Sequence, residues 1–147
     1  MKFNLNVIGN IIGILLMING VLMLTAVPFG IYFNENSFIG ILISSFLNIA
    51  VGFQFYHLTK NKGNKDLKRR DGYLIVTSSW IFMCLFGMLP YVLSGQIPSL
   101  TDAFFETVSG YTTTGATILN NIESLDHGIL FWRSLTHWIG GMGIIVL

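Results

Sequence analysis

The sequence predicts an all-α integral membrane protein, and its composition and charge pattern carry this prediction. Of the 147 residues, 52% are hydrophobic and only 10% are charged, whereas an ordinary soluble domain is roughly 25% charged. The mean hydropathy is +0.67. The charges are clustered, so that residues 3–34, 36–59 and 72–101 carry none. Each run is long enough to cross a bilayer, which takes about 20 apolar residues as helix. These features exclude a soluble enzyme, a disordered tail and a nucleic-acid module, and the net charge of +1 indicates no polyanionic partner.

Residues 1–58 are predicted to form two leading transmembrane helices, about Val7–Ile31 and about Ser37–Leu58. The first apolar run is too long for a signal peptide, whose apolar core has about 7–15 residues. Tyr32 and Phe33 close the first helix at a membrane interface, where aromatic rings are favoured. We therefore expect a retained helix at the N-terminus.

The first helix also carries small and polar residues. Gly9 and Gly13 have the spacing of a helix-packing motif, which is a weak signal on its own. Asn6, Asn10 and Asn19 indicate that one face of this helix meets protein instead of lipid.

Residues 59–72 form a basic loop with six of the eight basic residues in the chain: Lys60, Lys62, Lys65, Lys68, Arg69 and Arg70. A short loop of this composition stays on the cytoplasmic side. This predicts a cytoplasmic N-terminus and an external loop around Glu35. The basic loop is either a topology anchor alone or a dock for anionic lipid or a cytoplasmic subunit.

Residues 73–147 are predicted to form a second unit, with an outer helix over residues 73–94. Pro90 is expected to kink this helix near its outer end. A second helix starts at about residue 128 and returns to the inside. It stops without the charged or aromatic anchor that flanks most membrane helices. We therefore expect a truncated helix and a fragment of a longer protein.

The stretch between these helices predicts a pore loop. Ser99 and Asp102 have the spacing of a capping box, which starts a short helix over residues 99–110. The Thr-rich residues 112–117 disfavour helix, and Gly115 permits positive φ. Non-helical backbone at membrane depth is tolerated only against protein or a water-filled cavity. A half-helix, an extended segment and a return helix describe a re-entrant loop; a Thr-rich hairpin outside the membrane is the alternative.

Such a loop suits a desolvated alkali cation. Successive carbonyl oxygens of an extended segment replace the water shell of the ion, and the C-terminal end of the short helix contributes partial negative charge. The Thr-rich residues 112–117 are therefore a candidate filter for such a cation.

The remaining polar residues give weaker signals. His57, His127 and His137 lack metal-site spacing. Arg133 either faces a vestibule, pairs with Glu106 or Asp126, or anchors the helix at the interface.

Other residues fit structural roles. Glu106 either concentrates cations or accepts backbone hydrogen bonds, and Asp102 fits a cap better than a ligand. Gly140, Gly141 and Gly143 permit close packing or a bend of the last helix. Cys84, the single cysteine, excludes an intrachain disulfide. The sequence contains no motif for nucleotide binding or catalysis, so we expect no enzyme and no organic cofactor.

Two motifs resemble a known family. The run TDAFFETVSGYTTTGAT at residues 101–117 closely resembles the first pore loop of the TrkH/KtrB potassium transporter superfamily, and FWRSLTHWIGGMG at residues 131–143 resembles the opening of its second repeat helix. The similarity is continuous over about residues 99–147. The two leading helices resemble the TrkH branch, because the KtrB branch starts directly at the repeat.

The resemblance implies a potassium uptake protein of the cell membrane with four helix–pore loop–helix repeats, of which this chain supplies one. It also implies a homodimer and a TrkA-like cytoplasmic nucleotide-binding regulatory subunit. Potassium would be the transported ion. The resemblance implies that Thr112, Thr113, Thr114 and Gly115 form one quarter of its filter. Thr113 and Thr114 would be the main ligands, and Ala116 and Thr117 would continue the outer part. Because a filter needs four walls, one repeat cannot enclose a pore. The competing hypothesis is a non-conducting membrane adaptor, or an orphan repeat that assembles with other subunits.

Overall fold

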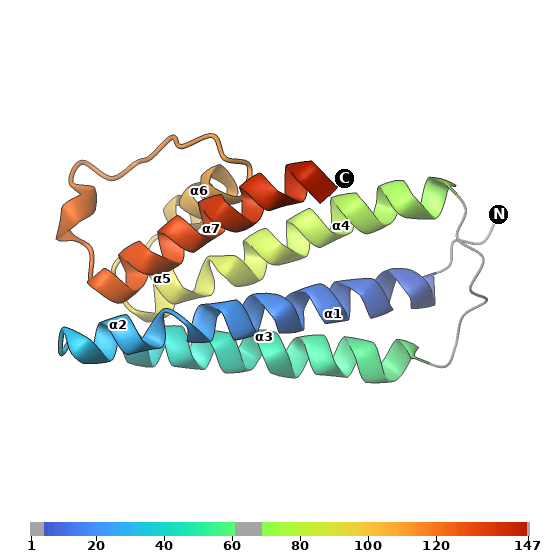
Figure 1. Ribbon diagram of the computed structural model, residues 1–147, viewed down its shortest axis with the longest axis horizontal. Helices are drawn as coiled ribbons and strands as arrows, with labels where there is room; N and C mark the ends of the chain where they lie inside the picture. Colours follow the sequence, from blue (N-terminus) through green and yellow to red (C-terminus); the bar gives the residue numbers. More distant parts are fainter. Residues whose placement is uncertain (1–4, 61–68, 147) are drawn as a thin grey trace.

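The computed structural model describes residues 5–60 and 69–146, and every regular element in these ranges is helical (Figure 1). Lys2 and residues 61–68, which include Lys62, Lys65 and Lys68 of the basic loop, lie outside the described residues. The elements in chain order are α1 (Leu5–Leu24), α2 (Val27–Tyr32), α3 (Ser37–Thr59), α4 (Arg69–Gly87), α5 (Leu89–Leu93), α6 (Leu100–Tyr111), the 3-10 helix η1 (Ile122–Ser124) and α7 (His127–Val146).

The first apolar run is not the single helix that the sequence predicts, because it breaks between α1 and α2. Pro28 has no N–H to donate to the carbonyl of Leu24, so the α-helical ladder cannot continue through this turn. Instead Thr25 and Ala26 donate backbone hydrogen bonds three residues back, at 3.1 and 3.0 Å. The helix resumes with Pro28 in its first turn, and together the two segments extend over 28 residues, Leu5–Tyr32.

Helices α1 and α3 lie side by side and run in opposite directions (Figure 1). They approach closely at a pair of glycines. A Cβ at Gly13 would lie 2.7 Å from the carbonyl oxygen of Gly52, and a Cβ at Gly52 would lie 2.7 Å from that of Gly13. Small residues of this kind let membrane helices approach closely. The packing face expected on the first helix is therefore present, with Gly13 at its centre.

The outer helix of the second unit is also interrupted. Helix α4 starts at Arg69, four residues before the predicted start, with Asp71 in its first turn, where an acidic residue is favourable. At its other end, α4 stops at Gly87, and α5 begins at Leu89 with Pro90 in its first turn. The carbonyls of Phe86 and Gly87, which lose helical partners at this break, are approached by Asn48 Nδ2 at 3.4 Å and by Trp132 Nε1 at 3.0 Å.

Three helical stretches of the described residues are long and apolar enough to cross a membrane: Leu5–Tyr32, Ser37–Thr59 and Asp71–Leu93. Helix α7, where the sequence predicts a return crossing, carries Arg133 and two histidines within its 20 residues.

The main core lies where the C-terminal end of α1 meets α2, α3, α5, α6 and α7. Its largest side chains are fully buried Trp132 and Tyr91, packed with Met23, Ile41 and Ile129. This core fixes α6 and α7 against each other and against the end of the α1–α3 pair at which α2 lies. A smaller apolar cluster joins α1, α3 and α4 at the opposite end.

Candidate functional site

Helix α6 is the short helix that the capping box predicts. The Ser99 side chain accepts a hydrogen bond from the Asp102 backbone N–H at 3.4 Å. The helix ends one residue later than predicted, because Gly110 stays helical instead of stopping it. Gly110 packs against Thr136 of α7, where a Cβ would clash with the Thr136 side chain. The glycine therefore serves helix packing.

The backbone turns sharply after α6. Thr113 and Thr114 donate backbone hydrogen bonds to Gly110 and Ser109 at 3.0 Å each. Thr112 has a φ of −81°, Thr113 a φ of 56° and Gly115 a φ of 74°. Gly115 has the positive φ that the sequence predicts. Thr113 differs from the expected extended backbone, and a β-branched residue at positive φ is an outlier.

Residues 112–118 are all exposed and run back along α6 (Figure 1). Near the end of the helix, Ser109 Oγ donates to the carbonyl oxygen of Ala116 at 2.6 Å. One turn earlier in the helix, Glu106 accepts hydrogen bonds from the Thr117 hydroxyl and, at 2.8 Å, from the Ile118 N–H. The exposed segment therefore runs antiparallel to α6. The segment lies within the length of the helical bundle, not beyond its end.

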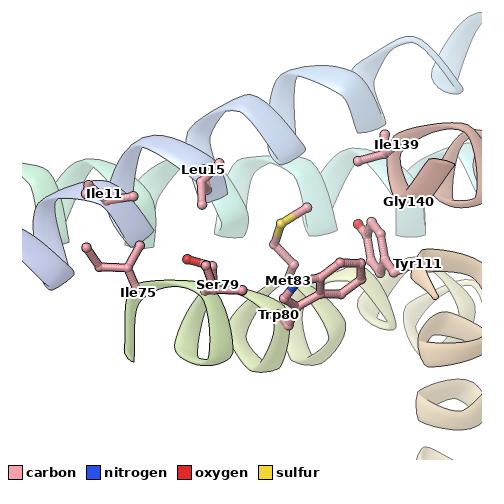
Figure 2. A pocket seen from close by; sticks show the side chains of 10 residues that line it. Ile11, Leu15, Ile75, Ser79, Trp80, Met83, Tyr111, Ile139 and Gly140 are labelled. Carbon is pink, nitrogen blue, oxygen red and sulfur yellow. The ribbon is translucent and has the colours of Figure 1, made fainter. Parts of the chain in front are cut away.

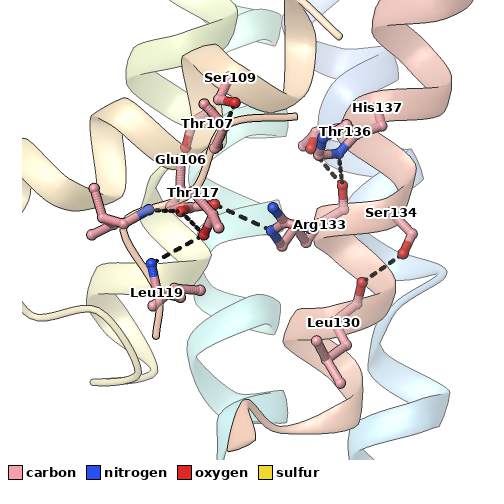
Figure 3. Close-up of polar contacts among 12 residues, drawn as sticks. Glu106, Thr107, Ser109, Thr117, Leu119, Leu130, Arg133, Ser134, Thr136 and His137 are labelled. Carbon is pink, nitrogen blue, oxygen red and sulfur yellow. Dashed lines mark hydrogen bonds and ion pairs between the residues drawn. The ribbon is translucent and has the colours of Figure 1, made fainter. Parts of the chain in front are cut away.

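Glu106 joins this segment to α7 (Figure 3). Its carboxylate has no exposed side-chain surface, and its second oxygen accepts a hydrogen bond from Arg133 Nε at 3.2 Å. Of the roles predicted for Arg133, the structure shows the pair with Glu106. Glu106 also accepts the backbone and hydroxyl bonds expected of a structural residue. The pair neutralises both charges beside the Thr-rich segment.

Helix α7 packs directly on the last residue of α6. A Cβ at Gly140 would lie 2.6 Å from the carbonyl carbon of Tyr111, so only glycine allows this approach. Of the two roles predicted for the glycines of this helix, Gly140 shows close packing. Among the described residues, the nearest atom to a Cβ at Gly141, the next residue, is the Thr113 methyl group at 4.0 Å.

The start of α7 is held by Glu35, from the loop between α2 and α3. Glu35 accepts hydrogen bonds from the N–H groups of His127 and Gly128 at 3.0 and 3.4 Å, and its carboxylate lies 2.6 Å from His127 Nδ1. Burial raises the pKa of Glu35, but these hydrogen bonds and the His127 charge outweigh it and hold the pKa below its ordinary value. Phe33 stacks on the His127 ring at 3.7 Å between centroids.

The other residues singled out from the sequence do not join this site. His57 lies near Phe53 on α3, and Cys84 is buried in α4. His137 lies one turn after Arg133, with Nδ1 2.9 Å from the Arg133 carbonyl oxygen. Within residues 5–60 and 69–146, no three His, Cys, Asp or Glu side chains gather as metal ligands.

The arrangement favours a cation over an anion. The C-terminal end of α6, with its partial negative charge, meets the exposed segment at Thr112. Residues 107–122 carry no formal charge. The backbone carbonyls and threonine hydroxyls of the exposed segment are oxygen ligands of the kind that hard cations accept.

Comparisons with known proteins agree with one another. The family TrkH, described as a cation transport protein, matches residues 37–147. The Trk system potassium uptake protein TrkH of Halomonas elongata is 37% identical over 145 residues, covering 98% of this chain and 30% of that protein. The protein of the same name from Escherichia coli K12 is 49% identical over 105 residues, covering 69% of this chain and 21% of that protein.

The structural comparison covers the whole chain. The crystal structure of the potassium transporter TrkH from Vibrio parahaemolyticus aligns with a TM-score of 0.90 and 35% sequence identity, over 100% of this chain and 31% of that one. The chain therefore spans about a third of the length of the relatives that it matches.

Proposed function

The chain belongs to the TrkH family of cation transport proteins, and on that premise we propose that it supplies one of the four selectivity-filter loops of a potassium uptake protein. The family transports cations and is not a family of enzymes. With three apolar helices long enough to span a bilayer, the chain is part of a multi-pass membrane protein. The proposal assigns α6 as the pore helix and residues 112–117 as the filter segment.

One observation carries this proposal: an exposed, non-helical segment runs back along a short capped helix, within the length of the bundle. Backbone polar groups at membrane depth need protein or water as partners. An exposed segment satisfies this need if it lines a water-filled pore closed by further repeats. The position of the segment beside α7 favours a pore loop over a hairpin outside the membrane.

The backbone of the segment suits ion coordination. In an ordinary strand, successive carbonyls point to opposite sides. Positive φ at Thr113 and Gly115, separated by Thr114, breaks this alternation and lets neighbouring carbonyls turn toward one side. A row of carbonyl oxygens on one side can replace the hydration shell of K⁺. Thr113 and Thr114 are the main ligands in this proposal, with Ala116 and Thr117 continuing the outer part.

The wider assembly is part of the same proposal. The N-terminus lies in the cytoplasm of the cell, because the basic loop of residues 59–72 remains inside. The full transporter forms a homodimer, and a TrkA-like nucleotide-binding subunit regulates it from the cytoplasm.

A chimeric transporter tests the proposal. In this chimera, the chain replaces the residues that it matches in the Halomonas elongata relative, in cells that lack other potassium uptake systems. We expect growth at low external K⁺ and uptake of K⁺ in preference to Na⁺. A chimera that reaches the membrane but transports nothing would favour the alternative of a non-conducting adaptor.

Gly115 provides the sharper test. Serine at this position would be strained by the φ of 74° and not by crowding, because no described atom lies within 4 Å of a Cβ there. Left-handed backbone costs a non-glycine residue roughly 1–2 kcal/mol, which corresponds to about a 5- to 30-fold change in an equilibrium constant. Gly115→Ser should lower K⁺ over Na⁺ selectivity by up to this factor.

Gly95 gives a matched control. It has the same φ of 74° and the same open surroundings among the described residues, but it lies before α6. Gly95→Ser introduces equal local strain and should leave selectivity unchanged. If both variants keep the selectivity of the unmodified chimera, residues 112–117 are not the filter.

A further inference from the structure

Tyr111, the last residue of α6, is the point from which the Thr-rich segment departs. Its side chain is 1% exposed. Its hydroxyl donates a hydrogen bond of 2.7 Å to Oδ1 of Asn19 in α1, 92 residues earlier in the chain. Buried hydroxyls need such a partner. A residue of the first membrane helix therefore contacts the residue that precedes Thr112.

Asn19 is itself held by a buried polar network. Its Nδ2 donates to Asn48 Oδ1 of α3 at 3.3 Å. Asn48 Nδ2 in turn lies 2.9 Å from the Ser44 carbonyl oxygen and 3.4 Å from that of Phe86, at the break between α4 and α5. Asn19 and Asn48 are 1% and 0% exposed. The Asn19 amide is thus fixed from α3, and its orientation toward Tyr111 is not free.

Packing alone does not fix the Tyr111 ring, because one side of it borders a cavity (Figure 2). The cavity has a volume of about 330 Å³, and apolar side chains such as Met83 and Ile139 line it. On α4, the ring contacts backbone: a Cβ at Gly87 would lie 2.8 Å from Tyr111 Cε2. The ring therefore has room to move into the cavity, and its hydroxyl would lose its partner there.

We propose that Asn19 is a positioning residue for the filter: by accepting the Tyr111 hydroxyl, it fixes the end of α6 and the direction in which residues 112–115 leave it. This inference rests on the proposed function of that segment. Asn19 touches no ion in this proposal and acts through Tyr111. It also lies outside residues 37–147, the part of the chain that matches the family.

Two substitutions remove the same hydrogen bond from its two ends. Asn19→Leu keeps the approximate volume and removes the acceptor, whereas Tyr111→Phe removes a single oxygen atom. One net hydrogen bond corresponds to roughly a 2- to 10-fold change in an equilibrium constant. In the chimera, each variant should lower K⁺ over Na⁺ selectivity by about this factor. The double variant should lower it no further, because both changes break one interaction.

A third variant controls for a polar-to-apolar change in α1. Asn10→Leu makes the same change nine residues away, about 14 Å along the helix, and should keep the selectivity of the unmodified chimera. All variants are compared at equal amounts in the membrane. If Asn19→Leu does not accumulate there, Tyr111→Phe decides alone, since it removes the hydrogen bond but keeps the apolar ring that the protein needs to fold.

The outcomes separate this inference from the proposed function. Unchanged selectivity in Tyr111→Phe, or additive losses in the double variant, would overturn the positioning role of Asn19. If Gly115→Ser lowers selectivity in the same chimera, the filter proposal stands although this inference falls. If Gly115→Ser also has no effect, both are wrong.

Discussion

Glu106 of α6 connects the Thr-rich segment to α7, so its removal should lower stability more than most single changes. Its carboxylate binds the Thr117 hydroxyl, the Ile118 N–H and Arg133 Nε. Glu106→Ala removes all three contacts at once. The Arg133 side chain, only 15% exposed, would keep its charge without a partner. Breaking a buried ion pair in this way costs about 3–5 kcal/mol.

Two further variants divide this loss into its causes. Glu106→Gln keeps an oxygen that can accept the Thr117 and Ile118 hydrogen bonds but removes the negative charge. It should cost less than Glu106→Ala. Adding Arg133→Leu to Glu106→Gln removes the unpaired charge as well, and replacing both partners of a buried pair is often close to neutral. The double variant should therefore recover most of the lost stability.

The assay is a denaturant titration of the purified chimera in lipid nanodiscs, followed by circular dichroism, which yields the free energy of unfolding for each variant. The expected order of stability is the unmodified chimera, the double variant, Glu106→Gln and then Glu106→Ala. A loss below about 1 kcal/mol for Glu106→Ala would refute the reasoning, because a surface ion pair gives that value. So would a double variant that is less stable than Glu106→Gln.

Two other predictions concern the ends of α7. Gly140→Ala should destabilise the chimera by about 1–3 kcal/mol, as overpacking does, because its Cβ would collide with the Tyr111 backbone. Gly141→Ala should not destabilise it, because a Cβ has room there. Equal melting temperatures for the two variants would contradict this prediction. At the other end, the depressed pKa of Glu35 means that its stabilising effect is present above its ordinary pKa of 4.5 and is lost as the pH falls through its lower folded value. Melting temperatures of Glu35→Gln and the unmodified chimera should therefore differ at pH 7, by an amount equivalent to about 0.3–1 kcal/mol, and converge in acid. If the difference in melting temperature does not narrow as the pH falls, ionisation of Glu35 is not what stabilises the chimera.

The sequence predicts the elements well where local chemistry decides them. The uncharged runs locate the helices that become α3 and α4, and the spacing of Ser99 and Asp102 locates the start of α6. The apolar pattern does not predict the break at Pro28, because the surrounding residues are as apolar as a continuous helix requires. The sequence predicts the end of α6 one residue early, at residue 110, because a glycine commonly ends a helix.

The contacts between distant residues were less predictable. The sequence allows the Glu106–Arg133 pair as one of several roles for these residues, because a charge pattern gives no distance between separate helices. No local signal marks Asn19 as the partner of Tyr111, although the asparagines of the first helix do indicate a face turned toward protein. The positive φ of Thr113 runs against the extended preference of threonine, so tertiary contacts override local preference there.

The positive φ of Thr113 indicates which residues determine ion selectivity. A strained residue keeps an unfavourable φ only if its surroundings over-determine it, since each such residue costs about 1–3 kcal/mol. Around Thr113, the constraints come from both sides: Tyr111 is fixed before it by Asn19 and α7, and Thr117 is fixed after it by Glu106. Loosening either side would let the segment relax toward ordinary extended backbone and turn its carbonyls apart. Substitutions at residues that touch no ion should therefore change ion preference, and those that remove either constraint should change it in the same direction.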